Sequence, residues 1–470
     1  MEEKKFIFNT IIVALVLNLV VPRLFARFAT DEEVNHPNGV GNLSYKGQFM
    51  HMMVDHSEDT LLTSVFIIVI IGVSGYVGYK VNPMKYLKYY ISTITLIIAF
   101  HVCFLGEYFP TVFFCCFSLF IILGDLIVNE DSAEQNYSKP YLLDFPMYLN
   151  FPLLLIILLI SAFMLSDVPQ NAFTDLVSAY LNINILDVRD SLNIFDSIFL
   201  VAQMGLFIGI MGTVPGHELV HRKKNKFDMF MGNWLLALSW DCAFAVEHVH
   251  GHHKNVGLAS DPATAKRGEN IYWFIINATL KEHRDAWKIE LDQMKRRSIP
   301  IWSIRNKMTL GYLRSASIIA LAFFIGGLKG TLFFLLFSFI AKALLEVINF
   351  SEHYGLVRVQ GEPVMPHHSW NSNSTLSSTY LYNVTRHSSH HERANLKYWE
   401  LRSYQNAPMM PQGYLTMLYM ALFLPNYFHR MMAKKLIDWD NHFATDKERM
   451  IAAKQNKNSG IPALIESVTS

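Results

Sequence analysis

The composition of the chain excludes an ordinary soluble protein. Of its 470 residues, 51% are hydrophobic and only 17% are charged, whereas soluble domains carry roughly 25% charged residues. Several membrane-buried segments are therefore predicted. Lys and Arg together number 40 against 39 for Asp and Glu, so no net charge attracts nucleic acid. The cysteines lack the spacing of a disulfide framework or a paired metal site, and we expect reduced thiols in the protein core: Cys103, Cys115, Cys116 and Cys242.

Apolar runs of the length that a membrane-spanning helix needs, about 20 residues, occur along much of the chain. Six of them precede residue 215, at 6–24, 61–79, 89–106, 108–124, 145–165 and 197–214. Two more, 315–328 and 330–350, meet at a Gly-rich turn, which predicts a helical hairpin. The run 413–424 is too short to cross easily, so it predicts an interfacial or docked helix.

The distribution of Lys and Arg orients these spans. Residues 215–307 contain 15 of them, whereas 166–196 contains only Arg189. Because short loops rich in Lys and Arg stay in the cytoplasm, the segment 215–307 is predicted to be cytoplasmic. We predict an all-α integral membrane protein with a six-helix transmembrane core, two extra N-terminal transmembrane helices and a cytoplasmic histidine-rich helical cap. Its two predicted units are an N-terminal extension, residues 1–85, and a membrane domain, residues 86–470.

Histidine is the unusual residue of this chain, because 13 of its 19 histidines fall within residues 217–391. They form clusters in four segments, 217–221, 247–253, 349–356 and 386–391. In the first cluster His217 and His221 are four residues apart, so both rings share one face of a helix and can reach one metal ion. The same spacing recurs at His248 and His252.

The number of histidines decides between kinds of metal site. The first cluster alone matches the HExxH pattern of zinc proteases, in which Glu218 would be the base. A catalytic zinc needs only three protein ligands, whereas the four clusters offer nine candidates, enough to saturate two metal ions. A redox pair is the simplest use of two such sites. A zinc protease and a membrane metal transporter stay open as alternatives, although a transporter would place its histidines along a transmembrane path.

The four clusters match, in order, the HELxH, EHxxGHH, NYxEHYGL and RHSxHH boxes of a known family. On these boxes the chain resembles the membrane di-iron alkane 1-monooxygenases, which include the hydroxylase component of xylene monooxygenase. The similarity extends to Gly124-Asp125-Leu126, Asp261-Pro262-Ala263 and the stretches 368–373 and 398–408. Two positions depart from the family pattern, since Ser389 stands where Asp is usual and Phe350 where Tyr is usual. Fatty-acyl desaturases and hydroxylases, which lack the EHYG box, are the nearest alternative.

The resemblance implies a non-haem di-iron centre. Carried over by position in the boxes, its nine ligands are His217, His221, His248, His252, His253, His353, His387, His390 and His391. The glutamates next to them are expected either to fix the ring tautomers or to form loop ion pairs: Glu218, Glu247 and Glu352. Candidate walls of a substrate channel, or plain packing residues, are Phe113, Phe114, Phe117 and Phe120. The remaining histidines of this region are expected to be structural: His250, His283, His367 and His368.

The resemblance also implies a reaction, the terminal hydroxylation of alkanes or similar hydrophobic chains to primary alcohols. It would use two iron ions, O2 and electrons from reduced rubredoxin, which a rubredoxin reductase supplies. The chain has no nucleotide-binding fingerprint, haem motif or cysteine set for an iron-sulfur cluster, so a separate donor must dock. The basic stretches 222–226 and 295–297 are candidate docking surfaces, or only topology signals. The expected location is a bacterial inner membrane rather than the endoplasmic reticulum, with the active site on the cytoplasmic side.

Overall fold

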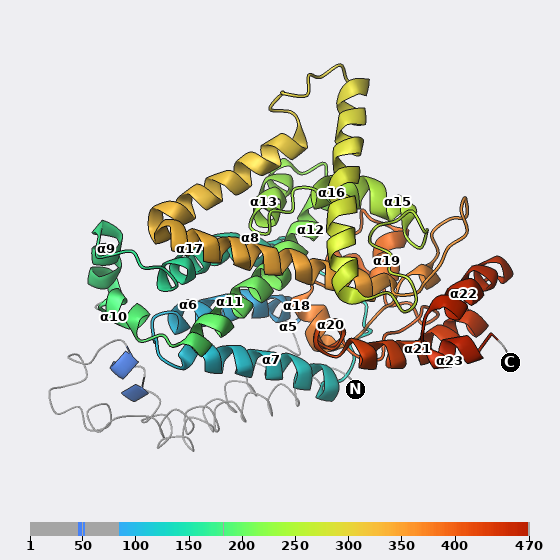
Figure 1. Ribbon diagram of the computed structural model, residues 1–470, viewed down its shortest axis with the longest axis horizontal. Coiled ribbons are helices and arrows are strands. Elements are labelled where there is room, and N and C mark those ends of the chain that lie inside the picture. Colours follow the sequence, from blue (N-terminus) through green and yellow to red (C-terminus); the bar gives the residue numbers. More distant parts are fainter. Residues whose placement is uncertain (1–45, 49, 52–83, 182, 469–470) are drawn as a thin grey trace.

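A computed structural model describes residues 46–48, 50–51, 84–181 and 183–468. The N-terminal spans predicted at 6–24 and 61–79 lie outside the described residues, as does most of the predicted extension. Within the described ranges the secondary structure is helical, and the only β features are two isolated bridges. Figure 1 shows long helices side by side, with shorter helices gathered at one end of the bundle. The all-helical prediction agrees with this architecture.

Four helices in the described part are long and apolar enough to cross a membrane, namely α7 (Phe109–Ile127), α8 (Tyr141–Met164), the continuous helix Ile194–His221 and α17 (Lys307–His353). The run expected at 89–106 forms α6 (Ile91–Val102), a helix of only 12 residues. It continues from the short helices α5 (Met84–Leu87) and η2 (Lys88–Tyr90). The described part of the predicted six-helix core therefore contains four long apolar helices, of which α17 comprises the two predicted runs 315–328 and 330–350, and the shorter α6.

The helix α17 forms the hairpin that the Gly-rich turn predicts. Gly327 has φ 60° and ψ −161°, a backbone conformation that glycine adopts without steric penalty. A Cβ atom on Gly330 would lie 2.6 Å from the carbonyl oxygen of Ala162 in α8, so glycine also allows a close approach between these helices. Figure 1 shows the two arms of α17 that result.

The continuous helix Ile194–His221 delivers the first histidine cluster. It consists of α11 (Ile194–Phe207), the π-helical segment η3 (Ile208–Thr213) and α12 (Val214–His221). π-Helical turns are rare and are frequently found at functional sites. After a short turn, α13 (Lys226–Ala237) packs on α12, where a Cβ atom on Gly232 would lie 3.0 Å from the carbonyl oxygen of Gly216. This close packing fixes the position of α12.

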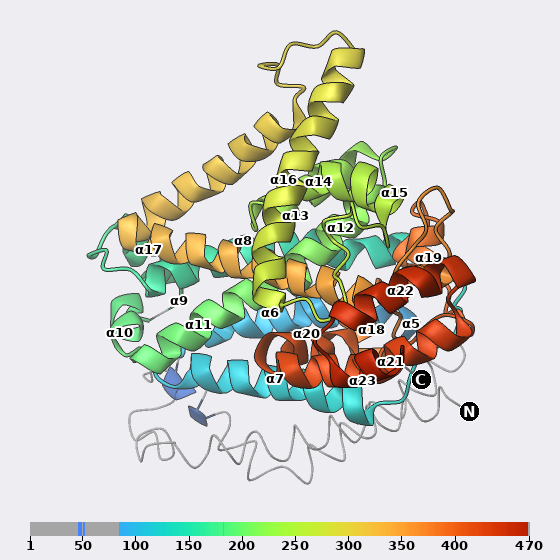
Figure 2. The same cartoon turned by 45° about the vertical axis from the view of Figure 1, so that its right-hand side comes forward.

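The end of the bundle that carries the histidines is covered by the chain after α13, as Figures 1 and 2 show. The elements in this region are α14 (Phe244–Glu247), η4 (His248–His252), α15 (His253–Asn255), α16 (Ile271–Arg296), η5 (Pro366–His368), α18 (Thr375–Tyr380), α19 (His387–Glu392), η6 (Tyr398–Glu400), α20 (Tyr414–Phe423), α21 (Pro425–His442), α22 (Asp446–Asn458) and α23 (Pro462–Glu466). The helices α9 (Ala172–Leu181) and α10 (Ile185–Asp190) lie at the opposite end. The short apolar run at 413–424 is a docked helix, because α20 contacts α7, α17 and α21.

A buried carboxylate ties the bundle to this covering layer. Asp125 of α7 accepts hydrogen bonds from the backbone N–H and the hydroxyl of Ser377 at 3.1 and 2.7 Å. It also accepts the backbone N–H and the hydroxyl of Thr416 at 3.2 and 2.8 Å. These bonds hold α18 and α20 against α7, and α18 leads directly toward the fourth histidine cluster.

The cysteines correct one prediction. Cys103 and Cys242 are buried, but Cys115 and Cys116 are exposed. Both exposed thiols belong to α7, whose apolar segment is only 22% buried inside the bundle. An apolar sequence cannot tell a lipid-facing position from a core position, since both environments favour the same residues.

Candidate metal centre

The histidines of the four sequence clusters converge in the structure. They form two adjoining groups of five and four residues, and within each group the candidate ligand atoms lie within 4.8 Å of one another. The first group, called the five-histidine group here, contains His217, His221, His248, His253 and His390. The second, the four-histidine group, contains His252, His353, His387 and His391. Every histidine that the sequence proposes as a ligand is thus brought into one of the two groups.

The Nε2 atoms of the five-histidine group face one another. Nε2 of His217 lies 2.9 Å from Nε2 of His248 and 3.0 Å from Nε2 of His390, and Nε2 of His221 is 3.1 Å away. A neutral imidazole carries one proton, so these contacts cannot all be hydrogen bonds. Two nitrogen ligands about 2.1 Å from one ion and at right angles lie about 3.0 Å apart. The observed spacing therefore fits a shared metal ion.

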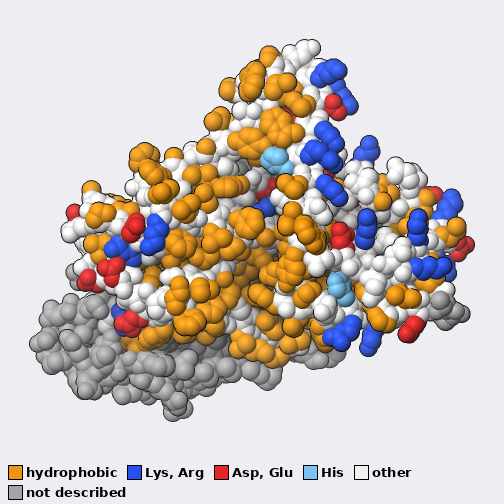
Figure 3. Space-filling model, viewed as in Figure 1, with side chains coloured by type: hydrophobic (Ala, Val, Ile, Leu, Met, Phe, Trp, Pro, Cys, Tyr) orange, Lys and Arg blue, Asp and Glu red, His pale blue; other side chains and the backbone are white. Residues whose placement is uncertain are grey.

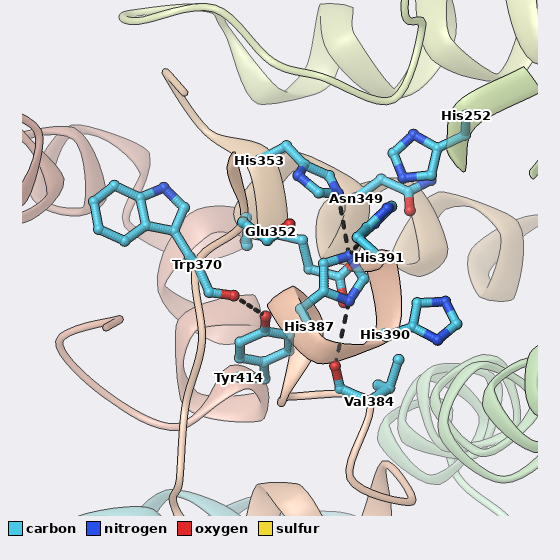
Figure 4. Close-up of polar contacts among 12 residues, drawn as sticks. His252, Asn349, Glu352, His353, Trp370, Val384, His387, His390, His391 and Tyr414 are labelled. Carbon is cyan, nitrogen blue, oxygen red and sulfur yellow. Dashed lines mark hydrogen bonds and ion pairs between the residues drawn. The ribbon is translucent and has the colours of Figure 1, made fainter. Parts of the chain in front are cut away.

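The four-histidine group has the same character. Figure 4 shows His353 and His387 pointing toward each other, with His391 beside them. Nε2 of His387 lies 3.1 Å from Nε2 of His353 and 3.0 Å from Nε2 of His391. Nε2 of His252 is buried without a hydrogen-bond partner. Because buried polar atoms are normally paired, this nitrogen fits a metal ligand.

The π-helical segment η4 distributes the second cluster over both groups. His248 and His252 repeat the spacing of four residues, but they lie in different groups. Nε2 of His248 lies 3.2 Å from Nε2 of His253, five residues later, whereas His252 belongs to the other group. Hydrogen bonds in a π-helix join residues five apart, which brings residues at this spacing onto one face. α19 divides similarly, because only His390 of that helix joins the five-histidine group.

Backbone carbonyls fix two of the rings. Nδ1 of His353 donates to the carbonyl oxygen of His368 at 3.1 Å. Nδ1 of His387 donates to the carbonyl oxygen of Val384 at 3.3 Å. A neutral ring whose proton is on Nδ1 offers the lone pair of Nε2 to a metal ion. Both rings are therefore in the tautomer that ligation at Nε2 requires.

Asp261 fixes a third ring and is a site residue that the sequence interpretation did not assign. Its buried carboxylate lies 3.0 and 3.2 Å from Nδ1 of His252 and accepts the hydroxyl of Thr264 at 2.6 Å. Burial lowers the pKa of His252, but the charge and the hydrogen bond of Asp261, together with the charges of Glu247 and Glu346, outweigh burial, and the pKa is raised above its usual value. The one sequence signal for this residue was the Asp261-Pro262-Ala263 stretch in the family similarity.

Glu218 forms an ion pair and does not contact a ring. Its carboxylate accepts hydrogen bonds from Arg222 at 2.8 Å and from the backbone N–H of Tyr398 at 3.2 Å. Arg222 also pairs with Asp144, and its side chain is only 7% exposed. The sequence alternative of a loop ion pair therefore describes Glu218, and Arg222 cannot belong to an exposed docking surface.

The other two glutamates lie closer to the rings. Burial raises the pKa of Glu247 to about 8, and the neighbouring charge of His252 opposes this shift. Glu352 is buried, and its Oε2 atom lies 3.4 Å from Nε2 of His387. Figure 4 shows the Glu352 side chain extending toward the His387 ring. Its carboxylate is thus next to the atom that faces the other imidazoles.

The remaining histidines stay outside both groups. His368 accepts the backbone N–H of Met365 at Nδ1, 2.9 Å away, so its proton is on Nε2 and is donated to Glu448 at 2.7 Å. This arrangement leaves no lone pair on Nε2 for an ion, although His367, His368 and Glu448 are close enough to hold one. His250 is half-buried, and burial lowers its pKa to about 4.

An apolar cavity, partly open to the outside, lies one helical turn from the histidines. Val214 precedes His217 by three residues in α12, and Ile348 precedes Glu352 by four in α17, so each pair shares a helix face. All lining residues are aliphatic or glycine: Leu206, Gly209, Ile210, Val214, Leu344, Leu345, Ile348, Leu381, Leu415 and Leu418. Pockets lined in this way bind apolar ligands.

The phenylalanines proposed as channel walls do not line this cavity. Phe117 is buried, and its ring centroid lies 5.3 Å from Phe207 and 5.7 Å from Tyr380. Phe113 also contacts Phe207, and Phe114 and Phe120 pack partly buried against the core. These contacts fit the alternative interpretation, in which the phenylalanines are packing residues.

Three comparisons place the chain among known proteins. A sequence-family model described as fatty acid desaturase matches residues 197–421, a stretch that contains both histidine groups. The chain is 37% identical over 233 residues to alkane 1-monooxygenase 2 of Pseudomonas aeruginosa, across 48% of this chain and 61% of that protein. It is 28% identical over 384 residues to the xylene/toluene monooxygenase hydroxylase component XylM of Pseudomonas putida, across 82% of this chain and 98% of that protein.

The chain is similar to the membrane alkane and xylene monooxygenases and, over residues 197–421, to the fatty acid desaturase family. The resemblance that the four histidine boxes predicted is thereby confirmed. The matched part of the chain spans 61% of the length of the first of these relatives. All nine box histidines lie within the matched residues 197–421, so the similarity includes the candidate metal centre itself.

Replacing Asp261 should weaken metal binding without removing a ligand. We expect Asp261→Asn to lower the affinity of the centre about 10- to 100-fold, the usual effect of losing a carboxylate that orients a ligating histidine. Competition with a chelator measures this change. Asp285→Asn, a substitution on the outer part of α16, is the matched control and should leave the affinity unchanged. Equal affinities for both variants would show that Asp261 does not orient His252.

Acidification should destabilise the metal-free protein. Burial lowers the pKa of four box histidines well below its usual value: His248, His387, His390 and His391. The unfolded chain therefore takes up these protons first, at about pH 6.5. Stability from the neutral rings is present above that pH and is lost below it. We expect the Tm of the metal-free protein to fall by roughly 5 °C or more between pH 7 and pH 5.

The raised pKa of His252 has the opposite effect on stability at low pH. It is a single group, whereas four histidines have a lowered pKa. Thermal unfolding in detergent, followed by circular dichroism at each pH, measures the trend. A Tm that stays constant or rises toward pH 5 would contradict the prediction.

Proposed function

We propose that this protein is a membrane monooxygenase that uses O2 to hydroxylate the terminal methyl group of an alkane, or of a similar hydrophobic chain, to a primary alcohol. One observation carries the proposal: two adjoining imidazole groups lie one helical turn from a cavity lined by aliphatic side chains and glycine. The named relatives are alkane and xylene monooxygenases, which supports a hydrophobic substrate. The catalytic unit in this proposal is residues 86–470.

Two iron ions are the proposed cofactor. Imidazole nitrogen suits iron as well as zinc and copper, and five plus four candidate ligands exceed what one ion can bind. Bound there, two iron ions supply the O2 activation and redox chemistry that no amino-acid side chain provides. The five-histidine group would hold one ion and the four-histidine group the other.

The side chains around the ions position the substrate and exclude water. Leu344, Leu345 and Ile348 of α17 line one side of the cavity and would hold an alkyl chain with its end toward the histidines. Burial of the reacting end keeps water away from the oxidising site. Imidazole ligands bring no negative charge, so the buried carboxylates of Asp261 and Glu352 would offset the charge of the ions.

A zinc protease function does not fit these contacts. A protease would need Glu218 as a free base, but this carboxylate is paired with Arg222. A catalytic zinc keeps an open position for water beside three ligands, whereas His217 and His221 meet three further imidazoles. A metal transporter is also disfavoured, because both groups gather at one end of the bundle instead of along it.

Fatty-acyl desaturation is the second candidate, because the family model that matches is described as fatty acid desaturase. Both reactions would use a metal centre held by histidines, so the product is what distinguishes them. Incubation with an alkane and with a fatty-acyl substrate, followed by gas chromatography and mass spectrometry, should give a 1-alkanol from the alkane. An alkene from the acyl chain as the sole product would assign the chain to desaturation.

A rubredoxin, reduced by a rubredoxin reductase, is the proposed electron donor. The site would face the cytoplasm, at a bacterial inner membrane, as the distribution of Lys and Arg favours. Three cations, Lys223, Arg297 and Lys307, act electrostatically on the half-buried His250, so the accessible side of the centre is basic. Complementary charge on an acidic donor would speed encounter with this surface.

The metal content tests the proposal directly. We expect about two iron ions per chain, measured by mass spectrometry of the metals. His353→Ala should lose at least one of these ions and should no longer oxidise alkanes. His250→Ala is the matched control, because His250 shares a box with three candidate ligands but lies outside both groups. A preparation loaded with zinc and free of iron that still makes alcohol would refute the proposed cofactor.

A side chain at Gly209 should shorten the preferred substrate. A Cβ atom at this position would meet its nearest neighbour, Leu344, only at 3.8 Å, so a larger residue can enter the cavity. We expect Gly209→Leu to lower turnover of long alkanes relative to short ones about tenfold or more, since each misplaced methylene costs about 1–3 kcal/mol. Phe117→Leu is the comparison variant. If only Phe117→Leu changed the chain-length preference, the substrate channel would run along the phenylalanines and not through this cavity.

Charge reversal tests the donor surface. We expect Lys223→Glu combined with Arg297→Glu to reduce rubredoxin-driven turnover about tenfold and to weaken its salt dependence. Turnover driven by a chemical reductant should be unchanged, because the metal ligands are intact. Lys434→Glu combined with Lys457→Glu alters two exposed cations on the C-terminal helices and is the control pair. Equal rubredoxin-driven rates in both double variants would exclude this docking surface.

A further inference from the structure

The helix α16 has an apolar face that the rest of the described chain leaves uncovered. Figures 1 and 2 show α16 running across the direction of α7, α8 and α17. Four exposed apolar side chains of α16 recur at intervals of three, four and eleven residues and therefore share one face. They are Trp273 (65% exposed), Ile276 (49%), Leu280 (65%) and Leu291 (36%). A helix that lies across membrane-spanning helices with an exposed apolar face has the geometry of an interfacial helix.

The loop after α16 continues this apolar surface. Ile301, Trp302 and Ile304 are 51%, 90% and 78% exposed. The following residues begin the first arm of α17, whose outer side is also apolar, with Phe324 82% exposed. The exposed apolar residues of α16, of this loop and of the first arm of α17 therefore lie on consecutive elements of the chain, and α17 is apolar enough to cross a membrane.

Aromatic hydrogen bonds attach the exposed face to α17. Nε1 of Trp287 donates to the hydroxyl of Tyr312 at 2.7 Å, and this hydroxyl lies 2.6 Å from Nε2 of His283. Tyr and Trp gather where a membrane meets water, because their rings are apolar and carry one polar atom. Their concentration at the start of the α17 arm matches that level of the bilayer.

Cations follow the flank of the same helix. Lys281, Arg284, Lys288 and Lys295 are exposed and recur at intervals of three, four and seven residues, so they share one face. Asp285 pairs with Arg284 at 3.3 Å and with Lys288 at 3.0 Å, which leaves a net positive flank. Figure 3 shows hydrophobic side chains on the side of this projecting arm that faces α17, and Lys and Arg on the other side.

We propose that α16 and the following loop lie in the headgroup layer of an anionic bilayer. The apolar face enters the boundary between headgroups and acyl chains, and the four flanking cations bind lipid phosphates. Long Lys and Arg side chains can cover apolar surface while their charged ends reach phosphates, and juxtamembrane cations attract anionic lipid. This surface is separate from the cavity and from both histidine groups, so the proposal does not depend on the proposed reaction.

Lipid contact would also steady the metal centre from outside. On its buried face, Glu282 of α16 lies 3.0 Å from Nζ of Lys342 and accepts Asn349 at 3.4 Å. Both partners belong to the α17 arm that ends at His353. An α16 helix fixed by the bilayer therefore braces the helix that carries a ligand of the four-histidine group.

Tryptophan fluorescence tests the position of the loop. The full chain is reconstituted in vesicles of phosphatidylglycerol and phosphatidylcholine, with and without bromine on the acyl chains, and the emission of Trp302→Phe is subtracted from that of the parent. Brominated lipid should quench this difference emission at least about twofold, while aqueous acrylamide should quench it weakly. Strong quenching by acrylamide with none by brominated lipid would overturn the proposal.

Native mass spectrometry tests the cations. Changing Lys281, Arg284, Lys288 and Lys295 to Gln should weaken retention of phosphatidylglycerol roughly tenfold or more, with phosphatidylcholine retention unchanged. The matched control changes four exposed cations of the C-terminal helices to Gln: Lys434, Lys447, Lys454 and Lys457. Equal retention of phosphatidylglycerol by both variants would refute a lipid surface. So would a fluorescence result in which Trp302 is protected from acrylamide only when a second copy of the chain or the electron donor binds.

Discussion

Nine imidazole rings crowded into one buried space are the constraint on which the rest of this fold depends. An unpaired buried polar atom costs about 1–3 kcal/mol, and nitrogens 2.9–3.2 Å apart cannot all be hydrogen-bonded to one another. The surrounding chain must therefore keep the rings in place. Arg386 holds the start of α19 through the carbonyl oxygens of Leu401 and Asp131, at 2.8 and 2.9 Å. Asp125 holds the preceding helix α18, so two sets of hydrogen bonds fix the chain that leads into α19.

Charge explains why buried carboxyl groups lie next to the histidine rings. Neutral ligands do not compensate metal ions, and a buried positive charge is unfavourable unless counter-charges lie near it. Asp261 and Glu352 are buried beside the four-histidine group, whereas Glu218 is already neutralised by Arg222. The two histidine groups thus differ in their surroundings as well as in ligand number. The buried carboxyl groups that are free of an arginine partner lie next to the group that has fewer imidazoles.

Much of the site could be predicted from the sequence, because ligand spacing on helices is a local property. His217 and His221 share a group as their spacing of four residues requires. The division of the second cluster could not be predicted, since it depends on a π-helical turn at 248–252 that no residue pattern announces. The cavity was also missed, because aliphatic residues from α11, α17 and α20 that are far apart in sequence converge there. Phenylalanines gave a stronger sequence signal but do not line this cavity.

The cavity and the candidate metal centre are built on the same helices, and this limits how each can change. Val214 and His217 lie one turn apart on α12, while Ile348 and His353 lie about one turn apart on α17. A substitution that shifts either helix to enlarge the cavity also moves a ligand, and metal sites tolerate only small displacements. Changes that leave the backbone in place are free of this conflict. Substrate range in this fold should therefore vary through side-chain size at positions such as Gly209 and Leu344, and not through helix movement.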